Sequence, residues 1–226
     1  MLYNAVILIP AESLMLLELQ RIQVPIGQTL ILNNITWPEF ERILEELGEK
    51  RSSRIAYHHG RLEIMVPLPE HESGKEMVGD FVKALLDELE IDFWALGSTT
   101  FKNALMLEGI EPDQCFYIEN EAAVRGKERL DLEIDPPPDL AIEIDITSRT
   151  HPEIYTALAV QELWRLSKGT LMIYILVNGA YQQVSESPHF PGFALTSAIE
   201  QALVMAKRDG RSVAMRWFQS QISIGQ

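Results

Sequence analysis

The residues best suited to chemistry lie in one short segment, from Asp139 to Ile146, in which acidic and apolar residues alternate. Successive side chains of a β-strand point to opposite faces, so a strand here has one apolar face and one face carrying Asp139, Glu143 and Asp145. Neighbouring carboxylates on a buried face repel each other unless water, a cation or a metal ion compensates their charge. Same-face neighbours lie about 7 Å apart, a spacing that suits one metal ion or two adjacent ions. An ordinary amphipathic strand with a wet polar face is the alternative.

A second acidic candidate lies upstream, in Glu111–Asp113, directly before the apolar segment Cys115–Ile118. Pro112 favours an extended conformation for Glu111, which would bring Asp113 to the edge of a strand. There its carboxylate would bind a metal ion or cap a turn, and an isolated tripeptide of this kind favours the turn.

Several short motifs in the chain are similar to those of one known family. They are Arg61–Met65, Pro67–Glu72, Gly97–Thr100, Glu111–Asp113, Pro138–Glu143 and Glu162–Trp164. Together, over about residues 28–192, they resemble the Uma-two family of restriction endonucleases, which is placed in the PD-(D/E)XK nuclease superfamily. The resemblance implies an α/β (α+β) fold with a restriction-endonuclease-like core, in which helices flank a mixed central sheet.

The resemblance also implies roles for individual residues. Asp113 matches the first aspartate of the superfamily, and Glu143 matches its second acidic metal ligand. These two side chains, with a backbone carbonyl near Ile144, would hold Mg²⁺ or Mn²⁺, which acidifies water and neutralises charge on phosphoryl oxygens. The implied function is therefore a metal-dependent endonuclease that hydrolyses phosphodiester bonds, with DNA as the expected partner.

One position departs from the superfamily pattern. Its lysine normally follows two residues after the second acid, and this chain has Asp145 there. Such a lysine orients or deprotonates the attacking water, or stabilises the charged transition state, and a carboxylate cannot replace its positive charge. We hypothesise that Lys102 supplies the ammonium group from a preceding strand, the alternative being an ordinary surface lysine.

Other polar residues near these motifs are weaker candidates. Glu72 or Glu76, from the first core helix, would add a third acid, and Glu63 is a further option. Side chains of this kind more often face solvent. His71 is expected near a helix start rather than on a metal, because no second histidine lies at helical ligand spacing.

The net charge of −14 bears on the choice of function. Acidic proteins are repelled by phosphate backbones, so the charge argues mildly against non-specific nucleic-acid binding. Metal bound to the carboxylates would offset part of that charge. Two alternatives stay open: a catalytically weak or inactive nuclease-like binding or interaction module, and a metal-dependent hydrolase of a small phosphorylated substrate.

The chain as a whole has the size of about one domain, with 226 residues. Its single cysteine, Cys115, excludes an intrachain disulfide and a cysteine-rich zinc site. The apolar stretch 5–17 follows no basic residue and is interrupted by Pro10 and Glu12, so we expect neither a signal peptide nor a membrane anchor. We therefore expect a cytoplasmic protein with no membrane partner, and the sequence leaves a homodimer open.

The elements that must position these residues follow from periodicity and turn signals. We predict helices between Thr36 and Gly48, over 72–90, over 153–166 and over about 196–206, and a charged loop over 120–133. We predict strands over 55–57, 62–66, 93–96, 99–102, 115–118, 140–146, 171–177 and 181–184, with the 140–146 strand at the centre of the sheet. Residues 1–27 would form an N-terminal extension, 28–192 the nuclease-like domain, and 193–226 a helical segment of the same domain.

Overall fold

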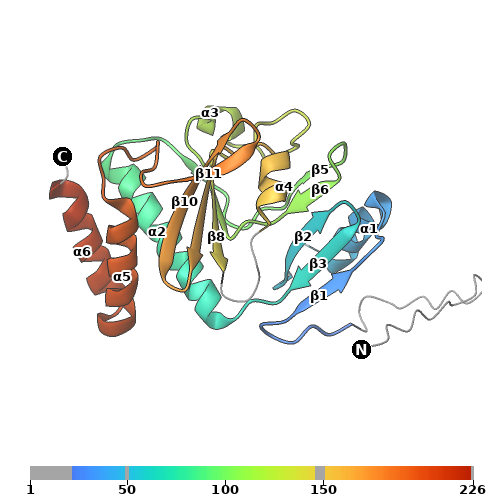
Figure 1. Cartoon of the computed structure of the whole chain (residues 1–226), viewed down its shortest axis with the longest axis horizontal. Helices are drawn as coiled ribbons and strands as arrows, with labels where there is room; N and C mark the ends of the chain where they lie inside the picture. The colour runs from blue at the N-terminus through green and yellow to red at the C-terminus, as the bar shows by residue number, and fades with distance from the viewer. Residues whose placement is uncertain (1–21, 49–50, 146–150, 225–226) are drawn as a thin grey trace, which may run out of the picture.

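The computed structural model describes residues 22–48, 51–145 and 151–224, whose strands form two sheets (Figure 1). The small sheet has the order β1-β3-β2-β6-β5 and consists of β1 (Thr29–Leu32), β2 (Arg54–His58), β3 (Arg61–Met65), β5 (Phe101–Asn103) and β6 (Glu108–Ile110). The large sheet has the order β11-β10-β9-β8-β7-β4 and consists of β4 (Trp94–Ala95), β7 (Gln114–Tyr117), β8 (Leu140–Asp145), β9 (Glu162–Ser167), β10 (Thr170–Val177) and β11 (Ala180–Val184). The helices are α1 (Trp37–Leu47), α2 (Pro69–Glu88), α3 (Glu121–Val124), α4 (Pro152–Ala157), α5 (Leu195–Asp209) and α6 (Arg211–Ile224).

The large sheet is mixed, since β8 and β9 run parallel and its other neighbouring strands run antiparallel. Leu140, Ile142 and Ile144 of β8 pack in one core cluster with α2, α5 and α6. On the other face of the sheet, Ala141 belongs to a second cluster that includes Tyr155 of α4. Figure 1 shows α5 and α6 on one side of the large sheet and the small sheet on the other. The predicted class, a mixed sheet flanked by helices, is confirmed.

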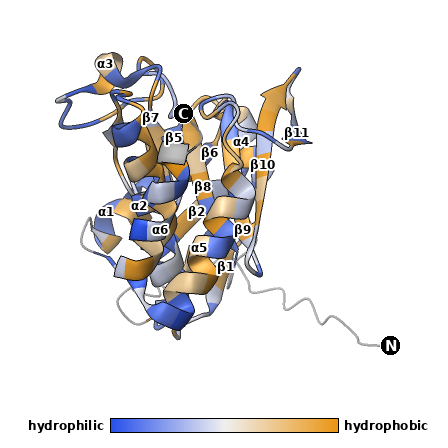
Figure 2. Cartoon of the chain, turned by 90° about the vertical axis from the view of Figure 1, so that its left-hand side faces the viewer, coloured by the Kyte–Doolittle hydropathy of each residue, from blue (hydrophilic) through white to orange (hydrophobic). Residues whose placement is uncertain are grey.

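The strand of alternating acidic and apolar residues is confirmed as central, with its apolar face in the core. It is observed as Leu140–Asp145, and Ile146 lies outside the described residues. Seen from the side of α5 and α6, the strands of the large sheet are mostly hydrophobic (Figure 2). Burial of alternate apolar side chains therefore fixes which residues of β8 can face a site.

The predicted first helix is also confirmed. The strands predicted over 55–57 and 62–66, and those over 171–177 and 181–184, pair as two antiparallel hairpins. Thr36 precedes α1, and its backbone N–H donates to the Glu39 carboxylate at 2.8 Å, a capping arrangement. The helix α2 begins at Pro69, three residues earlier than predicted, because proline fits the first turn of a helix.

The helix predicted over 153–166 is wrong beyond Ala157. The helix α4 ends at Ala157, and β9 follows as a strand paired in parallel with β8. Parallel neighbours need a crossover connection, and the short α4 provides it. Ala159 reverses the chain between them with a positive φ of 59°. Helical periodicity across this segment was therefore overridden by strand pairing.

Other elements were missed by the sequence patterns. The predicted 120–133 loop contains the short helix α3, and β1 and β6 were not predicted. The helical segment predicted over 193–226 consists of two helices, α5 and α6, of which only the first had predicted bounds. Within the described residues, the helices are all too short or too polar to cross a membrane.

Candidate metal-binding active site

The structure brings Asp113 and Glu143 together from segments far apart in the sequence. Asp113 directly precedes β7, and Glu143 lies in the neighbouring antiparallel strand β8. The two residues lie one step beyond the registered pair Gln114 and Ile142. The backbone N–H of Ile144 donates to Asp113 Oδ2 at 2.8 Å, so strand pairing itself fixes the aspartate.

Both carboxylates line a small cavity of about 40 Å³ between the two sheets. Its remaining walls come mainly from β2, β3 and β6 of the small sheet. The lining residues are Arg54, Ile55, Ala56, Glu63, Met65, Ile110, Glu111, Asp113, Glu143 and His151. The cavity thus combines four carboxylates with an arginine and a histidine.

The electrostatics of Glu143 reflect this crowding. Burial and the adjacent charge of Asp113 raise the pKa of Glu143 well above its usual range, although the hydroxyl of Tyr155 donates a hydrogen bond that opposes the rise. Asp113 is only 2% exposed. Two buried carboxylates whose mutual repulsion favours protonation are a donor set that suits a hard divalent cation such as Mg²⁺ or Mn²⁺. The residues therefore fit the metal that the sequence motifs imply.

Asp113 has a second buried neighbour, His71 at the start of α2. Its Nε2 lies 3.1 Å from Asp113 Oδ2. Burial lowers the pKa of His71, but the hydrogen bond and charge of Asp113 outweigh this and leave its pKa raised. His71 was predicted near a helix start and is found there, yet its contact with Asp113 was not anticipated.

Asp145 and Asp139 have other partners. The Asp145 carboxylate pairs with the guanidinium of Arg165 on β9, with Nη2 to Oδ2 at 2.5 Å. Asp139 accepts hydrogen bonds from the backbone N–H groups of Ile118, at 2.6 Å, and Asn120, at 3.0 Å. Each acid of the predicted polar face is therefore compensated differently, and of the three only Glu143 lines the cavity.

Lys102 does not join Asp113 and Glu143 in this cavity. It lies on β5, and its Nζ is 2.6 Å from Glu41 Oε1 of α1. Its side chain is 41% exposed. The structure thus places the predicted replacement for the missing lysine in a surface ion pair.

Among the weaker acidic candidates, Glu63 of β3 lines the cavity. Glu72 does not, but it pairs with Arg54, with Oε1 3.2 Å from Nη2. Glu76 is exposed on α2 and lies 3.9 Å from Lys75 Nζ. Only one of the three thus reaches the cavity.

The positive groups of the cavity, His151 and Arg54, were missed by sequence reasoning. His151 Nε2 lies 3.0 Å from Glu63 Oε2, and its Nδ1 lies 3.1 Å from Glu153 Oε1. The hydrogen bond to Glu63 raises the pKa of His151 more than burial lowers it. The sequence position of His151 could have indicated its role, because it lies just before Pro152 and a few residues after the acidic strand.

Comparison with known proteins now identifies the family. A search of curated proteins finds no match. Among solved structures, the chain is similar to one described as "a putative nuclease" from Anabaena variabilis, with 16% sequence identity and a TM-score of 0.49, covering 81% of this chain and 99% of that one. The model of the Uma2 family, described as "Putative restriction endonuclease", matches residues 37–206. Because that match spans well over half of its 226 residues, the chain belongs to the Uma2 family.

Proposed function

We propose that this protein is a metal-dependent endonuclease that hydrolyses phosphodiester bonds, with Asp113 and Glu143 holding Mg²⁺ or Mn²⁺. The observation that carries the proposal is the buried pair itself, which faces a cavity and raises the pKa of Glu143. Membership of the Uma2 family supports a nuclease and therefore a nucleic-acid substrate, for which DNA is our first choice.

The surrounding residues hold the carboxylates in place. Ile144 N–H orients Asp113, and the Tyr155 hydroxyl orients Glu143 from α4. The chemistry that a divalent ion would supply, when held by these two carboxylates, is to lower the pKa of a water molecule and to offset charge on the phosphoryl oxygens. Preorganised ligands of this kind cost little rearrangement during the reaction.

A positive group is also needed, because Asp145 stands where the superfamily carries lysine and pairs with Arg165. We assign this role to His151, which lines the cavity and whose pKa the hydrogen bond to Glu63 raises. The protonated imidazole would donate its proton to the leaving oxygen, as general acids do. Arg54, on the opposite strand β2, would add a fixed positive charge near the scissile phosphate.

The test is cleavage of plasmid and single-stranded DNA with Mg²⁺ or Mn²⁺. We expect Asp113→Asn and Glu143→Gln, which keep the size of each side chain, to lower the rate about a hundredfold or more. Lys102→Ala is the matched control and should cleave like the wild type, since Lys102 pairs with Glu41 outside the cavity. Failure of well-folded wild type to cleave, or equal cleavage by both acidic variants, would contradict the proposal.

The second candidate is a nuclease-like binding module that does not cleave. It is favoured by Asp145, which occupies the position of the usual lysine and pairs with Arg165. Mn²⁺ binding that depends on Asp113 and Glu143, without cleavage of any DNA or of small phosphodiesters, would support this module over the enzyme.

A further inference from the structure

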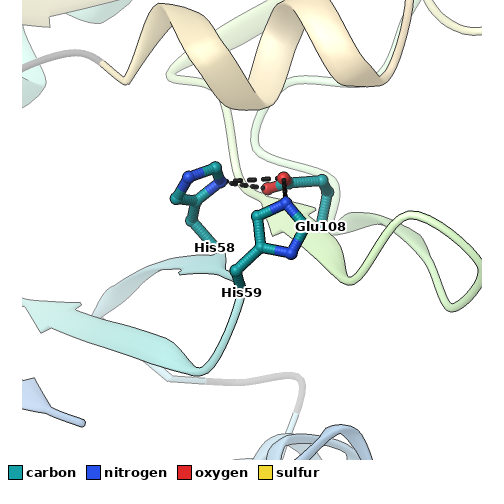
Figure 3. A group of neighbouring side chains, drawn as sticks. All are labelled: His58, His59 and Glu108. Atoms are coloured by element: carbon teal, nitrogen blue, oxygen red, sulfur yellow. Dashed lines mark hydrogen bonds and ion pairs between the residues drawn. The ribbon is translucent and has the colours of Figure 1, made fainter. Parts of the chain in front are cut away.

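A second cluster of metal-binding side chains lies apart from Asp113 and Glu143. It consists of His58, His59 and Glu108, which point toward one another in Figure 3. His58 Nδ1 lies 2.8 Å from Glu108 Oε1, and His59 Nε2 lies 3.4 Å from the same oxygen. One ligand atom from each residue lies within 4.8 Å of the others.

The fold of the small sheet builds this cluster. His58 ends β2 and lies directly opposite Glu108 of β6 in the antiparallel ladder. His59 and Gly60 form the tight turn of the β2–β3 hairpin, with positive φ values of 43° and 88°. The backbone N–H of His59 donates to Leu107 O at 3.1 Å, which fastens the turn beside Glu108. The three side chains are thus held by strand pairing rather than by a long loop.

Glu108 makes the cluster electrostatically unusual. Its side chain is only 1% exposed, and burial raises its pKa against the opposing effect of the two histidines. The carboxylate of Glu153 in α4 raises it further. A buried carboxylate is stable in its charged form only when a positive charge compensates it. A divalent cation bound between Glu108 and the two imidazoles would provide that charge.

We propose that His58, His59 and Glu108 form a second metal site, for a transition-metal ion of the Zn²⁺ type. Two imidazole nitrogens and one carboxylate oxygen are a donor set of zinc, whereas Mg²⁺ prefers oxygen ligands alone. With metal–ligand distances of about 2.0–2.1 Å, two ligands of a tetrahedral zinc lie about 3.3 Å apart. The observed separations of 2.8 and 3.4 Å from Glu108 Oε1 lie on either side of that value, and all three ligand atoms lie within 4.8 Å of one another. Zinc binding would then require the ligand atoms that lie farthest apart to move closer together.

The site keeps one coordination position open. The cluster borders a cavity of about 630 Å³, whose walls also include Glu153, Arg165, Tyr174 and Tyr181. Three protein ligands with an open position are typical of zinc sites that exchange a water or an anionic ligand. Glu153 also contacts His151, so the two sites are neighbours across α4. Their donor sets predict opposite metal preferences, Zn²⁺ here and Mg²⁺ or Mn²⁺ at Asp113 and Glu143.

The experiment uses Co²⁺ as a visible substitute for Zn²⁺ on the full chain after treatment with a chelator. Glu143→Gln removes the acidic site, so any remaining Co²⁺ absorption in that variant comes from elsewhere. We expect one equivalent of Co²⁺ to give tetrahedral-type absorption bands in both wild type and Glu143→Gln, and Zn²⁺ to abolish them by competition. Because the readout is spectroscopic, it does not depend on nuclease activity.

The variant His59→Ala should weaken Co²⁺ and Zn²⁺ binding at least about tenfold, since losing even a partner of a ligand costs that much. The side chain of His59 is 60% exposed, so its removal should leave the fold intact. Glu108→Gln should have the same effect on binding, and circular dichroism would check its fold. His189→Gln alters a histidine that pairs with Glu162 and does not line the cavity beside the cluster, so it is the matched control. Absence of Co²⁺ bands in folded wild type, or bands unchanged in His59→Ala, would overturn the proposal and leave a hydrogen-bonded pair only.

Discussion

At the scale of single residues, the cavity shows how like charges are made tolerable. Asp139 is satisfied by backbone N–H groups, Asp145 by Arg165, and Asp113 by Ile144 N–H and His71. Glu143 keeps a neutral partner, the Tyr155 hydroxyl, and its pKa is raised as a result of burial and the charge of Asp113. A cation would therefore be stabilised most strongly beside Glu143.

The role of His151 makes a prediction at this scale. His151→Ala should lower the cleavage rate about a hundredfold, the usual range for a lost proton donor, while leaving Mn²⁺ affinity unchanged. The separation is expected because His151 contacts Glu63 and Glu153 rather than Asp113 or Glu143. Single-turnover cleavage and a Mn²⁺ titration measure the two quantities, with Lys102→Ala as the control. A variant that cleaves at the wild-type rate would remove His151 from the mechanism.

A site residue could be predicted when a local sequence motif marks it, and not when only tertiary packing brings it to the cavity. Asp113 and Glu143 stood out because short motifs surround them, and β-strand alternation separated Glu143 from the core. His151 and Arg54 reach the cavity only through the packing of the small sheet on the large one, which no local pattern encodes. The assignment of Lys102 had the weakest basis, because being near a motif in sequence does not mean being near it in space.

At the scale of elements, the connection from α4 to β9 is the informative error. The chain leaves the helix at Leu158 and turns at Ala159, whose φ of 59° is unfavourable for a residue with a Cβ atom. Val160 and Leu163 then enter the core under the sheet. Parallel pairing with β8 is a long-range contact, so helical spacing of apolar residues could not reveal it.

That turn offers a stability test. Ala159→Gly should stabilise the protein by about 0.5–1 kcal/mol, because glycine adopts positive φ without steric cost. Ala157→Gly, at the last residue of α4, is the control and should not stabilise the protein, since Ala157 has no positive φ for glycine to relieve. Urea denaturation of both variants measures the difference. If both substitutions were destabilising, the left-handed turn would not be strained.

A second element-level prediction concerns His189, which joins the segment after β11 to Glu162 of β9. Its Nδ1 lies 2.5 Å from Glu162 Oε2. Burial lowers the pKa of His189, but the hydrogen bond and charge of Glu162 outweigh it and the pKa is raised. A raised folded-state pKa stabilises the protein fully below the unfolded value of about 6.5, and this stabilisation is lost as pH rises through the folded-state pKa.

The comparison of wild type with His189→Gln isolates this effect. The wild type should lose stability on the order of 1 kcal/mol more than the variant between pH 6 and pH 9, as expected for a hydrogen bond to a charged group. His59→Ala is a control, because it removes an exposed histidine and leaves the His189–Glu162 pair intact. Parallel curves for wild type and His189→Gln in urea titrations across that range would show that the pair does not govern the pH dependence.

At the scale of the whole molecule, the net charge of the chain and the charge of the cavity both oppose the binding of DNA. A chain of charge −14 repels DNA at long range, and the carboxylates of the cavity repel a phosphate at short range. Arg54 and His151 offset part of the charge in the cavity, but four acids line it with them. The proposed nuclease should therefore need the metal ion for binding its substrate as well as for cleaving it.

This dependence is measurable as DNA affinity. Binding of a fluorescent duplex should strengthen about tenfold or more when Ca²⁺, a hard oxygen-binding cation, replaces a chelator, because each uncompensated carboxylate near a phosphate costs on the order of 1 kcal/mol or more. Glu143→Gln should reduce the response to Ca²⁺, since it removes one of the two proposed metal ligands. Lys102→Ala should behave as the wild type, which separates the cavity from the general surface. Tight binding in the chelator, with no response to Ca²⁺, would mean that DNA is held elsewhere on the molecule and that the acidic cavity is not its cleavage site.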